Sequence, residues 1–238
     1  SEDYVYKHAI NMGILVALMS SKMNLSYVEQ MEIITAGLVH DIGKINLPYE
    51  IKIKYGEYTD EDLKVVNKCL TEGLEALRPE FNISQGVKRI ITQFFGIEYQ
   101  KKETDKLLTG TKIMLVADAF DTMTAMQLQI EPTSTLAAIK EMLANDNYDK
   151  EVVSALVASL DILYPGVCIE LTNKQTALVI KANQADVLRP VVLDFQTNHI
   201  YDLSVPSTYK EVQISDIMRT MDNRIKVDPE RLKEYIGK

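Results

Sequence analysis

Residues 36–44 read Ala-Gly-Leu-Val-His-Asp-Ile-Gly-Lys, which places an imidazole and a carboxylate side by side at the end of an apolar segment. Ser26 and Glu29 precede this segment with the spacing of a capping box, so a helix is predicted from Ser26 to Asp41. Apolar residues recur along it at helical spacing, at Met31, Ile34 and Leu38 and again at Ile33 and Gly37. This pattern predicts a helix that belongs to the core.

A buried His40-Asp41 pair needs a partner, because polar and charged groups are costly to remove from water. A metal ion can supply it, since it accepts one nitrogen and one oxygen ligand from consecutive residues. The alternative is a hydrogen bond between the two side chains near the helix end, with Gly43 stopping the helix.

A second histidine is predicted to point into the same core. His8 lies in a helix expected over residues 3–22, where it shares an apolar stripe with Tyr4, Met12, Leu15 and Met19. A single core histidine is usually satisfied by an ordinary hydrogen bond, but two antiparallel neighbouring helices could bring His8 and His40 together. The third histidine, His199, falls in a polar, strand-like stretch and is not assigned to a site.

Two carboxylates come from the otherwise apolar segment at residues 112–121. Asp118 and Asp121 are three residues apart and therefore project from the same side of a helix. Two histidines and two aspartates on three core helices would form an octahedral metal site with open positions for water. The alternative for the aspartates is capping or a salt bridge to Lys44 or Lys112.

The order of these residues resembles the HD superfamily of metal-dependent phosphohydrolases, and in particular its HD-GYP branch, the cyclic di-GMP phosphodiesterases of bacteria. Residues 40–48, His-Asp-Ile-Gly-Lys-Ile-Asn-Leu-Pro, resemble the family's HDIGK segment with its following proline, and residues 54–56 and 59–62 continue it. Residues 116–121, Val-Ala-Asp-Ala-Phe-Asp, resemble the family's late VAD-x-x-D helix. The resemblance covers the chain from about residue 4 to about residue 165.

The resemblance implies a role for each matching residue. One divalent metal ion would be bound by His8, His40, Asp41 and Asp118. Asp41 would be catalytic as the family's bridging ligand, and Lys44 would be catalytic by binding a phosphate. Asp121 would lie behind the metal ligands or on the substrate side. These ligand types do not distinguish iron, manganese, zinc and nickel.

The chain also departs from the family pattern. Cys69 stands four residues before Gly73, where the family has a histidine, and Gln93 and Phe94 stand near a paired histidine and glutamate of the family. The polar residues 98–103 replace the loop that ends in Gly-Tyr-Pro, and residues 126–129 replace an Arg-Pro-Tyr-Arg-like segment. In the family the positions of Cys69, Gln93 and Phe94 serve additional metal ions.

Three functions follow as hypotheses. The first is a degenerate HD-GYP domain that retains one metal site and acts as a signalling or protein-interaction module without efficient cyclic di-GMP hydrolysis. The second is a mononuclear phosphohydrolase that acts on a nucleotide or another phosphate ester. The third is a cyclic di-GMP phosphodiesterase with an altered metal site.

Composition excludes several other classes of function. The chain has 238 residues, 46% of them hydrophobic, and a formal net charge of −8, which argues against binding nucleic acid or an anionic membrane. No apolar run is long enough to insert into a membrane, and two cysteines without paired spacing fit a reducing cytoplasm. The chain begins inside a helix, and the resemblance implies an upstream sensor or receiver module. A cyclic dinucleotide or nucleotide is an expected ligand, and a homodimer is left open.

The predicted fold is mainly α, a bundle of about seven helices with a small C-terminal antiparallel sheet. The helices are expected at 3–22, 26–41, 59–79, 84–96, 110–125, 132–144 and 149–164. Strands are expected at 167–171, 177–180, 190–195 and 199–203, followed by a short helix after Asp228-Pro229. The change of periodicity at Pro165-Gly166 predicts a helical domain over 1–165 and a β-rich extension over 166–238.

Overall fold

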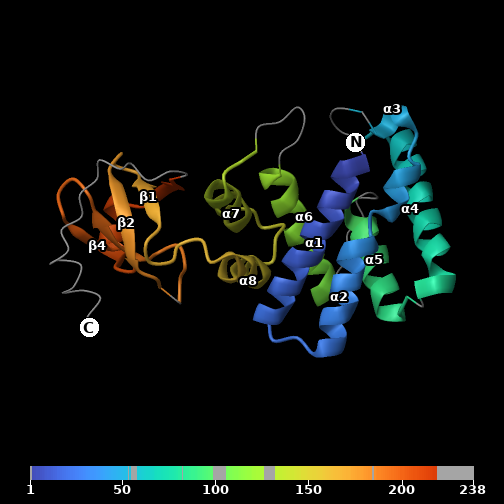
Figure 1. The fold of residues 1–238 in the computed structure, drawn as a ribbon, viewed down its shortest axis with the longest axis horizontal. Coiled ribbons are helices and arrows are strands. Elements are labelled where there is room, and N and C mark those ends of the chain that lie inside the picture. Colours follow the sequence, from blue (N-terminus) through green and yellow to red (C-terminus); the bar gives the residue numbers. More distant parts are fainter. Residues whose placement is uncertain are drawn as a thin grey trace. The chain divides into compact units, whose positions relative to one another are not determined.

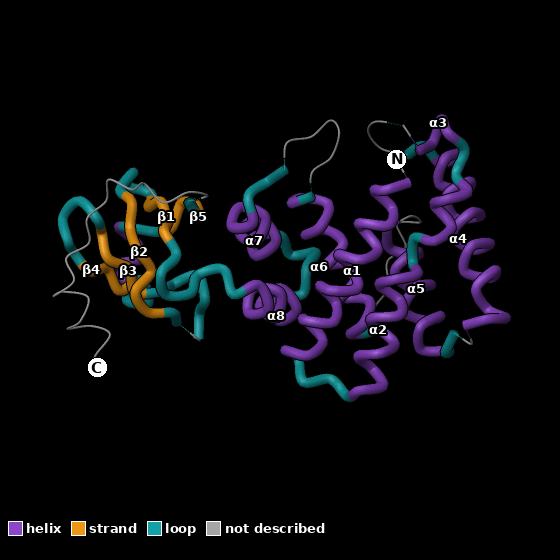
Figure 2. Tube along the Cα trace, in the orientation of Figure 1, coloured by secondary structure: helices purple, strands orange, loops and turns teal. Residues whose placement is uncertain are grey.

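Figure 1 shows the computed structural model of the chain. The structure describes residues 2–52, 54, 58–81, 83–98, 106–125, 132–183 and 185–218, and the remaining residues are grey in Figure 2. Four predictions concern residues outside these ranges: the family-like residues 55–56, the segments 99–103 and 126–129, and the helix after Asp228.

The predicted fold class, mainly α with a small C-terminal antiparallel sheet, is confirmed. Contacts within the chain define two units, one of Ser1–Thr133 with Glu141–Ser159 and one of Ser134–Lys140 with Leu160–Lys238. The domain boundary at Pro165-Gly166 lies shortly after Leu160 and stays a prediction.

The helical elements agree with most of the predicted ones. Among the described residues they are α1 (Glu2–Lys22), α2 (Tyr27–Val39), the 3-10 helix η1 (Ile42–Asn46), α3 (Tyr49–Lys52), α4 (Asp60–Phe81), α5 (Gln85–Glu98), α6 (Thr109–Thr124), α7 (Thr135–Ala144) and α8 (Lys150–Leu160).

The predicted capping box of α2 is confirmed, and a similar cap starts α4. The Ser26 side chain accepts from the backbone N–H of Glu29, and the Glu29 carboxylate accepts from the N–H of Ser26, which completes a capping box. Asp62 accepts from the N–H of Thr59 at the start of α4 in the same way. Each cap satisfies backbone donors that the first turn of a helix leaves unpaired.

Three predicted helix boundaries were wrong. Helix α4 continues through Pro79 to Phe81, because a proline inside a helix can kink it without ending it. Helix α7 starts at Thr135 rather than 132, since Ser134 Oγ accepts from the N–H of Ala137 and caps it there. Helix α8 ends at Leu160 rather than near 164, because Asp161 has a positive φ of 46°.

The buried face of α2 also differs from one of the two predicted stripes. Ile33, Ala36 and Gly37 are buried, whereas Met31 and Leu38 are exposed. Both stripes are apolar, so hydrophobicity alone does not choose between them. The stripe with Ile33 and Gly37 is the one that packs against α1, where a Cβ on Gly37 would lie 3.0 Å from Cγ2 of Val16.

A second close approach fixes η1, which carries the end of the His-Asp segment. A Cβ atom on Gly43 would lie 2.1 Å from the carbonyl oxygen of Cys69 and 2.5 Å from Cα of Leu70 in α4. A Cβ on Gly73 would lie 2.5 Å from Cα of Gly43. The two glycines thus allow backbone-to-backbone contact between η1 and α4, which no larger residue permits at these positions.

The C-terminal unit holds a five-stranded antiparallel sheet with the order β4-β3-β2-β1-β5. Its elements are β1 (Cys168–Leu171), β2 (Thr176–Lys181), β3 (Val191–Asp194), β4 (Ile200–Asp202), α9 (Pro206–Glu211) and β5 (Ile214–Ile217). Four of the strands were predicted. The sequence analysis missed β5 and α9, because β5 is only four residues long and two of them, Ser215 and Asp216, are polar.

None of the helices in the described ranges combines the length and the apolar character needed to cross a membrane.

Candidate metal centre

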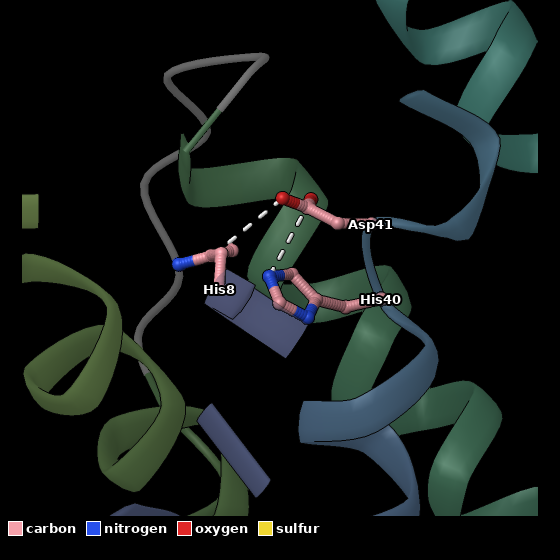
Figure 3. A group of neighbouring side chains, drawn as sticks. All are labelled: His8, His40 and Asp41. Carbon is pink, nitrogen blue, oxygen red and sulfur yellow. Dashed lines mark ion pairs between the residues drawn. The ribbon is translucent and has the colours of Figure 1, made fainter. Parts of the chain in front are cut away.

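Three buried side chains meet where α1 passes the end of α2. One ligand-type atom from each of His8, His40 and Asp41 lies within 4.8 Å of the others, and Figure 3 shows the three side chains facing one another. His8 comes from α1, His40 is the C-cap of α2, and Asp41 precedes η1. Residues from two helices and one turn are thus brought to one point.

The backbone at the end of α2 directs the two consecutive side chains. His40 keeps helical angles, with φ −56° and ψ −36°, and its N–H donates to the carbonyl of Ala36. Asp41 has φ −98° and ψ 4°, in the sparsely populated bridge region where many active-site residues are found. The chain therefore leaves the helix at Asp41.

One ring nitrogen of His40 and one carboxylate oxygen of Asp41 face each other without a hydrogen-bond donor between them. Nδ1 lies 2.9 Å from the carbonyl oxygen of Gly37, which can only accept, so Nδ1 carries the proton. Nε2 of His40 and Oδ1 of Asp41 are buried, have no hydrogen-bond partner among the described residues, and lie 3.4 Å apart. Two lone pairs in this arrangement call for a cation between or beside them.

Burial keeps His40 neutral. It lowers the pKa of His40, and the opposing attraction of Asp41 and Asp118 does not overcome it. Burial would also raise the pKa of Asp41, but the charge and the hydrogen bond of Lys44, with the charge of His8, hold that pKa below its ordinary value. At neutral pH the pair therefore offers an unprotonated imidazole nitrogen and an ionised carboxylate, which are the forms that bind metal ions.

His8 is oriented by the second aspartate of α6. Its Nδ1 donates to Oδ2 of Asp121 over 2.7 Å, and Asn11 Nδ2 donates to the other oxygen of Asp121 over 2.8 Å. The second ring nitrogen, Nε2, lies 3.2 Å from Oδ1 of Asp118 and 3.6 Å from Oδ2 of Asp41. Asp121 thus lies behind His8, and Asp118 lies on the side of the ring that faces the centre.

The surrounding carboxylates give the centre a strongly negative character. Burial lowers the pKa of His8, but the hydrogen bonds to Asp118 and Asp121 and the charge of Asp41 raise it, so that the pKa reaches about 9. In the absence of a metal ion, His8 therefore holds a proton that balances part of the carboxylate charge. Desolvation and the negative charge of Asp118 also raise the pKa of Glu98, at the end of α5. The negative electrostatic potential of the centre therefore reaches this residue.

These residues fit a divalent cation. The buried lone pairs of His40 and Asp41 lack a donor, a second imidazole faces the same point, and the nitrogen and oxygen donors suit iron, manganese, zinc or nickel alike. Asp118, the fourth predicted ligand, lies outside the group of atoms within 4.8 Å of one another, and it contacts the centre through Nε2 of His8, 3.2 Å from its Oδ1.

Lys44, predicted to bind a phosphate, lies next to the centre. Its Nζ is 2.5 Å from Oδ2 of Asp41, and its side chain is partly exposed. The ammonium thus neutralises one side of the Asp41 carboxylate and reaches toward solvent on the other.

The three positions that the resemblance links to additional metal ions are not among the ligand atoms of this group. The Cys69 thiol is 3.7 Å from the carbonyl oxygen of Asn46. Gln93 bonds through its amide to the backbone of Lys106 and Leu108, and so holds the start of α6. The fully buried ring of Phe94 packs edge-on against His40, with centroids 5.3 Å apart.

The sequence of this chain is similar to that of a family of proteins that bind metal ions. Residues 2–152, more than half of the chain, match the HD domain family. The chain belongs to the HD domain family. This family is metal-dependent, and the triad of His8, His40 and Asp41 is a possible metal site of this HD domain.

Three relatives support an HD or HD-GYP type of domain, as the sequence predicted. The HD domain chain is 25% identical over 206 residues to the cyclic di-GMP phosphodiesterase PA4108 of Pseudomonas aeruginosa, covering 82% of this chain and 49% of the relative. It is 31% identical over 161 residues to a cyclic di-GMP phosphodiesterase of Thermotoga maritima, covering 64% and 44%. It is 21% identical over 199 residues to PdeB of Borreliella burgdorferi, covering 81% and 52%. The chain thus spans about half the length of these relatives.

Sequence reasoning missed Asn11, although a signal for it was present. Asn11 follows His8 by three residues, so the two lie on the same side of α1, and it is a polar residue beside an otherwise apolar stripe. Asn11 donates to Oδ1 of Asp121 and so orients the carboxylate, whose other oxygen, Oδ2, accepts from His8. Such a partner behind a metal ligand sets which ring nitrogen is left for the metal.

The variant Asn11→Ala is expected to weaken metal binding about tenfold, the lower end of the loss seen when a hydrogen-bond partner of a metal ligand is removed. Isothermal titration calorimetry on metal-free protein measures the change. The matched variant Lys7→Ala, at an exposed position of the same helix beside His8, should bind like wild type. Equal affinity of the Asn11 variant and wild type would show that Asp121 needs no second donor.

Proposed function

We propose that this HD domain holds one divalent metal ion through His8, His40, Asp41 and Asp118, and that it acts as a signalling or protein-interaction module without efficient cyclic di-GMP hydrolysis. The observation that carries the proposal is the Phe94 ring against His40. The ring puts apolar carbon at a position that the resemblance links to a ligand of an additional metal ion.

The other two substituted positions support the same proposal. The Cys69 thiol is directed to the Asn46 carbonyl, and Gln93 is engaged by the backbone at residues 106–108. Among the residues that the structure describes, the group of possible metal ligands consists of His8, His40 and Asp41. Its composition favours one ion over two.

A single ion limits the chemistry that this site can perform. A bound divalent ion would polarise a phosphoryl oxygen and lower the pKa of a bound water. Two-metal sites stabilise the attacking and the leaving oxygen together, and the loss of one such preorganised charge commonly costs on the order of 10² to 10³ in rate. Lys44 can bind one phosphate oxygen, but its charge is already shared with Asp41.

A second candidate function is hydrolysis of a simpler phosphate ester at the single ion. It is favoured by the exposure of Lys44 and Asp118, whose side chains remain 23% and 19% accessible beside otherwise buried ligands. A phosphate could therefore reach both the cationic ammonium and the metal position from solvent. In this function Asp41 and Lys44 would be the catalytic residues.

The names of the relatives make cyclic di-GMP the natural test compound. Manganese- or iron-loaded protein is expected to contain about one metal ion per chain and to release no linear dinucleotide or GMP at several turnovers per minute. Metal analysis and chromatography of the products measure both quantities. Product formation that Asp41→Ala abolishes, together with two or more ions per chain, would replace this proposal by an active phosphodiesterase. Turnover of other nucleotides with one ion would favour the second candidate.

The proposed role also concerns partners. A sensor or receiver module, or another signalling protein, would respond to the state of this domain, and a cyclic dinucleotide or nucleotide would be its ligand. A reducing cytoplasm as its location stays a prediction, with which the free Cys69 and Cys168 are consistent.

A further inference from the structure

A stripe of large apolar side chains runs along the outside of α1. Tyr6, Ile10, Ile14 and Leu18 follow one another at intervals of four residues, and their exposed fractions are 55%, 57%, 54% and 43%. Residues at this spacing lie on one face of a helix. The opposite face of α1, with Met12, is the one that packs in the core.

The exposed apolar surface continues onto α2. Figures 1 and 2 show α1 and α2 side by side, and Leu38 of α2 covers Gly13 of α1, where a Cβ would lie 2.6 Å from Leu38 Cδ2. Tyr27, Met31 and Leu38 follow one another in α2 at intervals of four and seven residues and thus share a face, and each is more than 40% exposed. We call the seven residues of this surface the hairpin face: Tyr6, Ile10, Ile14, Leu18, Tyr27, Met31 and Leu38.

The hairpin face has the size and the charge of an interface. Its side chains expose on the order of 700 Å², against roughly 800 Å² per partner in a standard stable complex. Contiguous apolar patches of this size on a protein surface mark interaction sites. Between His8 and Lys22, α1 carries no ionisable side chain, although a quarter of the chain's residues are charged.

We propose that the hairpin face is the contact between two copies of this chain, related by a two-fold axis, which pair α1 against α1 in a homodimer. The proposal does not depend on the function of the metal centre. The spacing of the stripe supports a second copy as the occupant. Ridges at intervals of four residues interdigitate with identical ridges at about −50°, the commonest class of helix packing. A two-fold contact requires such a self-complementary surface.

Charge supports the same partner. Each copy carries a formal net charge of −8, so two copies repel one another over most of their surfaces. The repulsion is weakest where the surface carries no charge. Burying an apolar surface also gives the largest gain in free energy. A positively charged partner would instead bind acidic surface, which the hairpin face lacks.

The test uses the complete chain of 238 residues and multi-angle light scattering coupled to size exclusion. Wild type is expected at twice the chain mass of 26.9 kDa at high micromolar concentration. The double variants Ile10→Lys/Ile14→Lys and Ile10→Glu/Ile14→Glu are each expected at the monomer mass, because both place like charges across the two-fold axis. An equimolar mixture of the two is expected to recover the dimer mass, since opposite charges then face each other.

The control replaces an exposed apolar residue of the same unit outside the hairpin face. Tyr49→Lys, at a side chain 70% exposed in α3, should leave the dimer intact. Circular dichroism checks that every variant keeps the wild-type helix content. A wild type that is monomeric at high concentration, or double variants that remain dimeric, would overturn the proposal. Failure of the mixture to recover the dimer would show that α1 does not meet α1, and would equally overturn it.

Discussion

Replacing Gly43 by alanine is expected to lower the free energy of unfolding by about 3 kcal/mol, because the added methyl meets backbone that cannot rotate away. The nearest atoms would be the carbonyl oxygen of Cys69 at 2.1 Å and Cα of Leu70 at 2.5 Å. Helix α4 and η1 must separate to make room, and η1 begins directly after Asp41. Urea denaturation followed by circular dichroism measures the loss, and metal titration measures the damage to the centre.

The matched control is Gly13→Ala. There the nearest atoms belong to the partly exposed, rotatable side chain of Leu38, at 2.6 and 3.1 Å. Because alanine is favoured over glycine in a helix by about 1 kcal/mol, this variant should stay within about 1 kcal/mol of wild type. If both variants lose the same free energy of unfolding, Gly43 is not required for the contact between η1 and α4.

Removing the metal ion is expected to lower the melting temperature of the wild-type protein by roughly 5 to 10 °C. A ligand at a hundred times its Kd stabilises the folded state by about 2.7 kcal/mol, and each kcal/mol shifts Tm by about 2 to 4 °C in a chain of this size. Differential scanning calorimetry with and without chelator measures the shift. His40→Ala is expected to melt lower than metal-loaded wild type and to show no response to chelator.

His199→Ala provides the matched histidine control for this measurement. His199 is exposed and meets the Tyr201 ring edge-on in the C-terminal unit, with ring centroids 4.6 Å apart. Its variant should keep the full response to chelator. If wild type melts at the same temperature with and without chelator, the His40-Asp41 pair is a structural feature and the ion does not contribute to folding.

The sequence allowed the family and the residues of the candidate centre to be predicted, because few of its residues can carry this chemistry. The chain has three histidines, and one of them stands next to an aspartate at the end of an apolar helix. The metal-binding roles of His8, His40, Asp41 and Asp118 remain proposals. What the sequence could not supply is the orientation of the rings, which depends on acceptors such as the Gly37 carbonyl that only the folded backbone places.

Parts of the fold depended on contacts that no local pattern encodes. Strand β5 exists because Ile214 pairs with Leu171 and Ile217 with Ile169, more than forty residues away in the chain. In α2 two apolar stripes competed for the core, and the stripe with Ile33 and Gly37 packs inside while Met31 and Leu38 stay outside. Local periodicity detects an amphipathic helix, but it does not say which of two apolar faces has a partner.

Helix α7 has a consequence for dissecting the protein into fragments. Its first turns, within Ser134–Lys140, belong to the C-terminal unit, and its end belongs to the helical unit. Leu136 packs in the apolar cluster with Ile169 and Val192, and the Lys140 ammonium donates to the Ile214 carbonyl. A fragment ended at residue 165 would therefore expose Leu136 to water and leave Lys140 without this acceptor. The two units interleave along residues 134–159, so a single cut can leave one unit whole but not both. Limited proteolysis within these residues should therefore release at least one piece that folds less well than the intact chain.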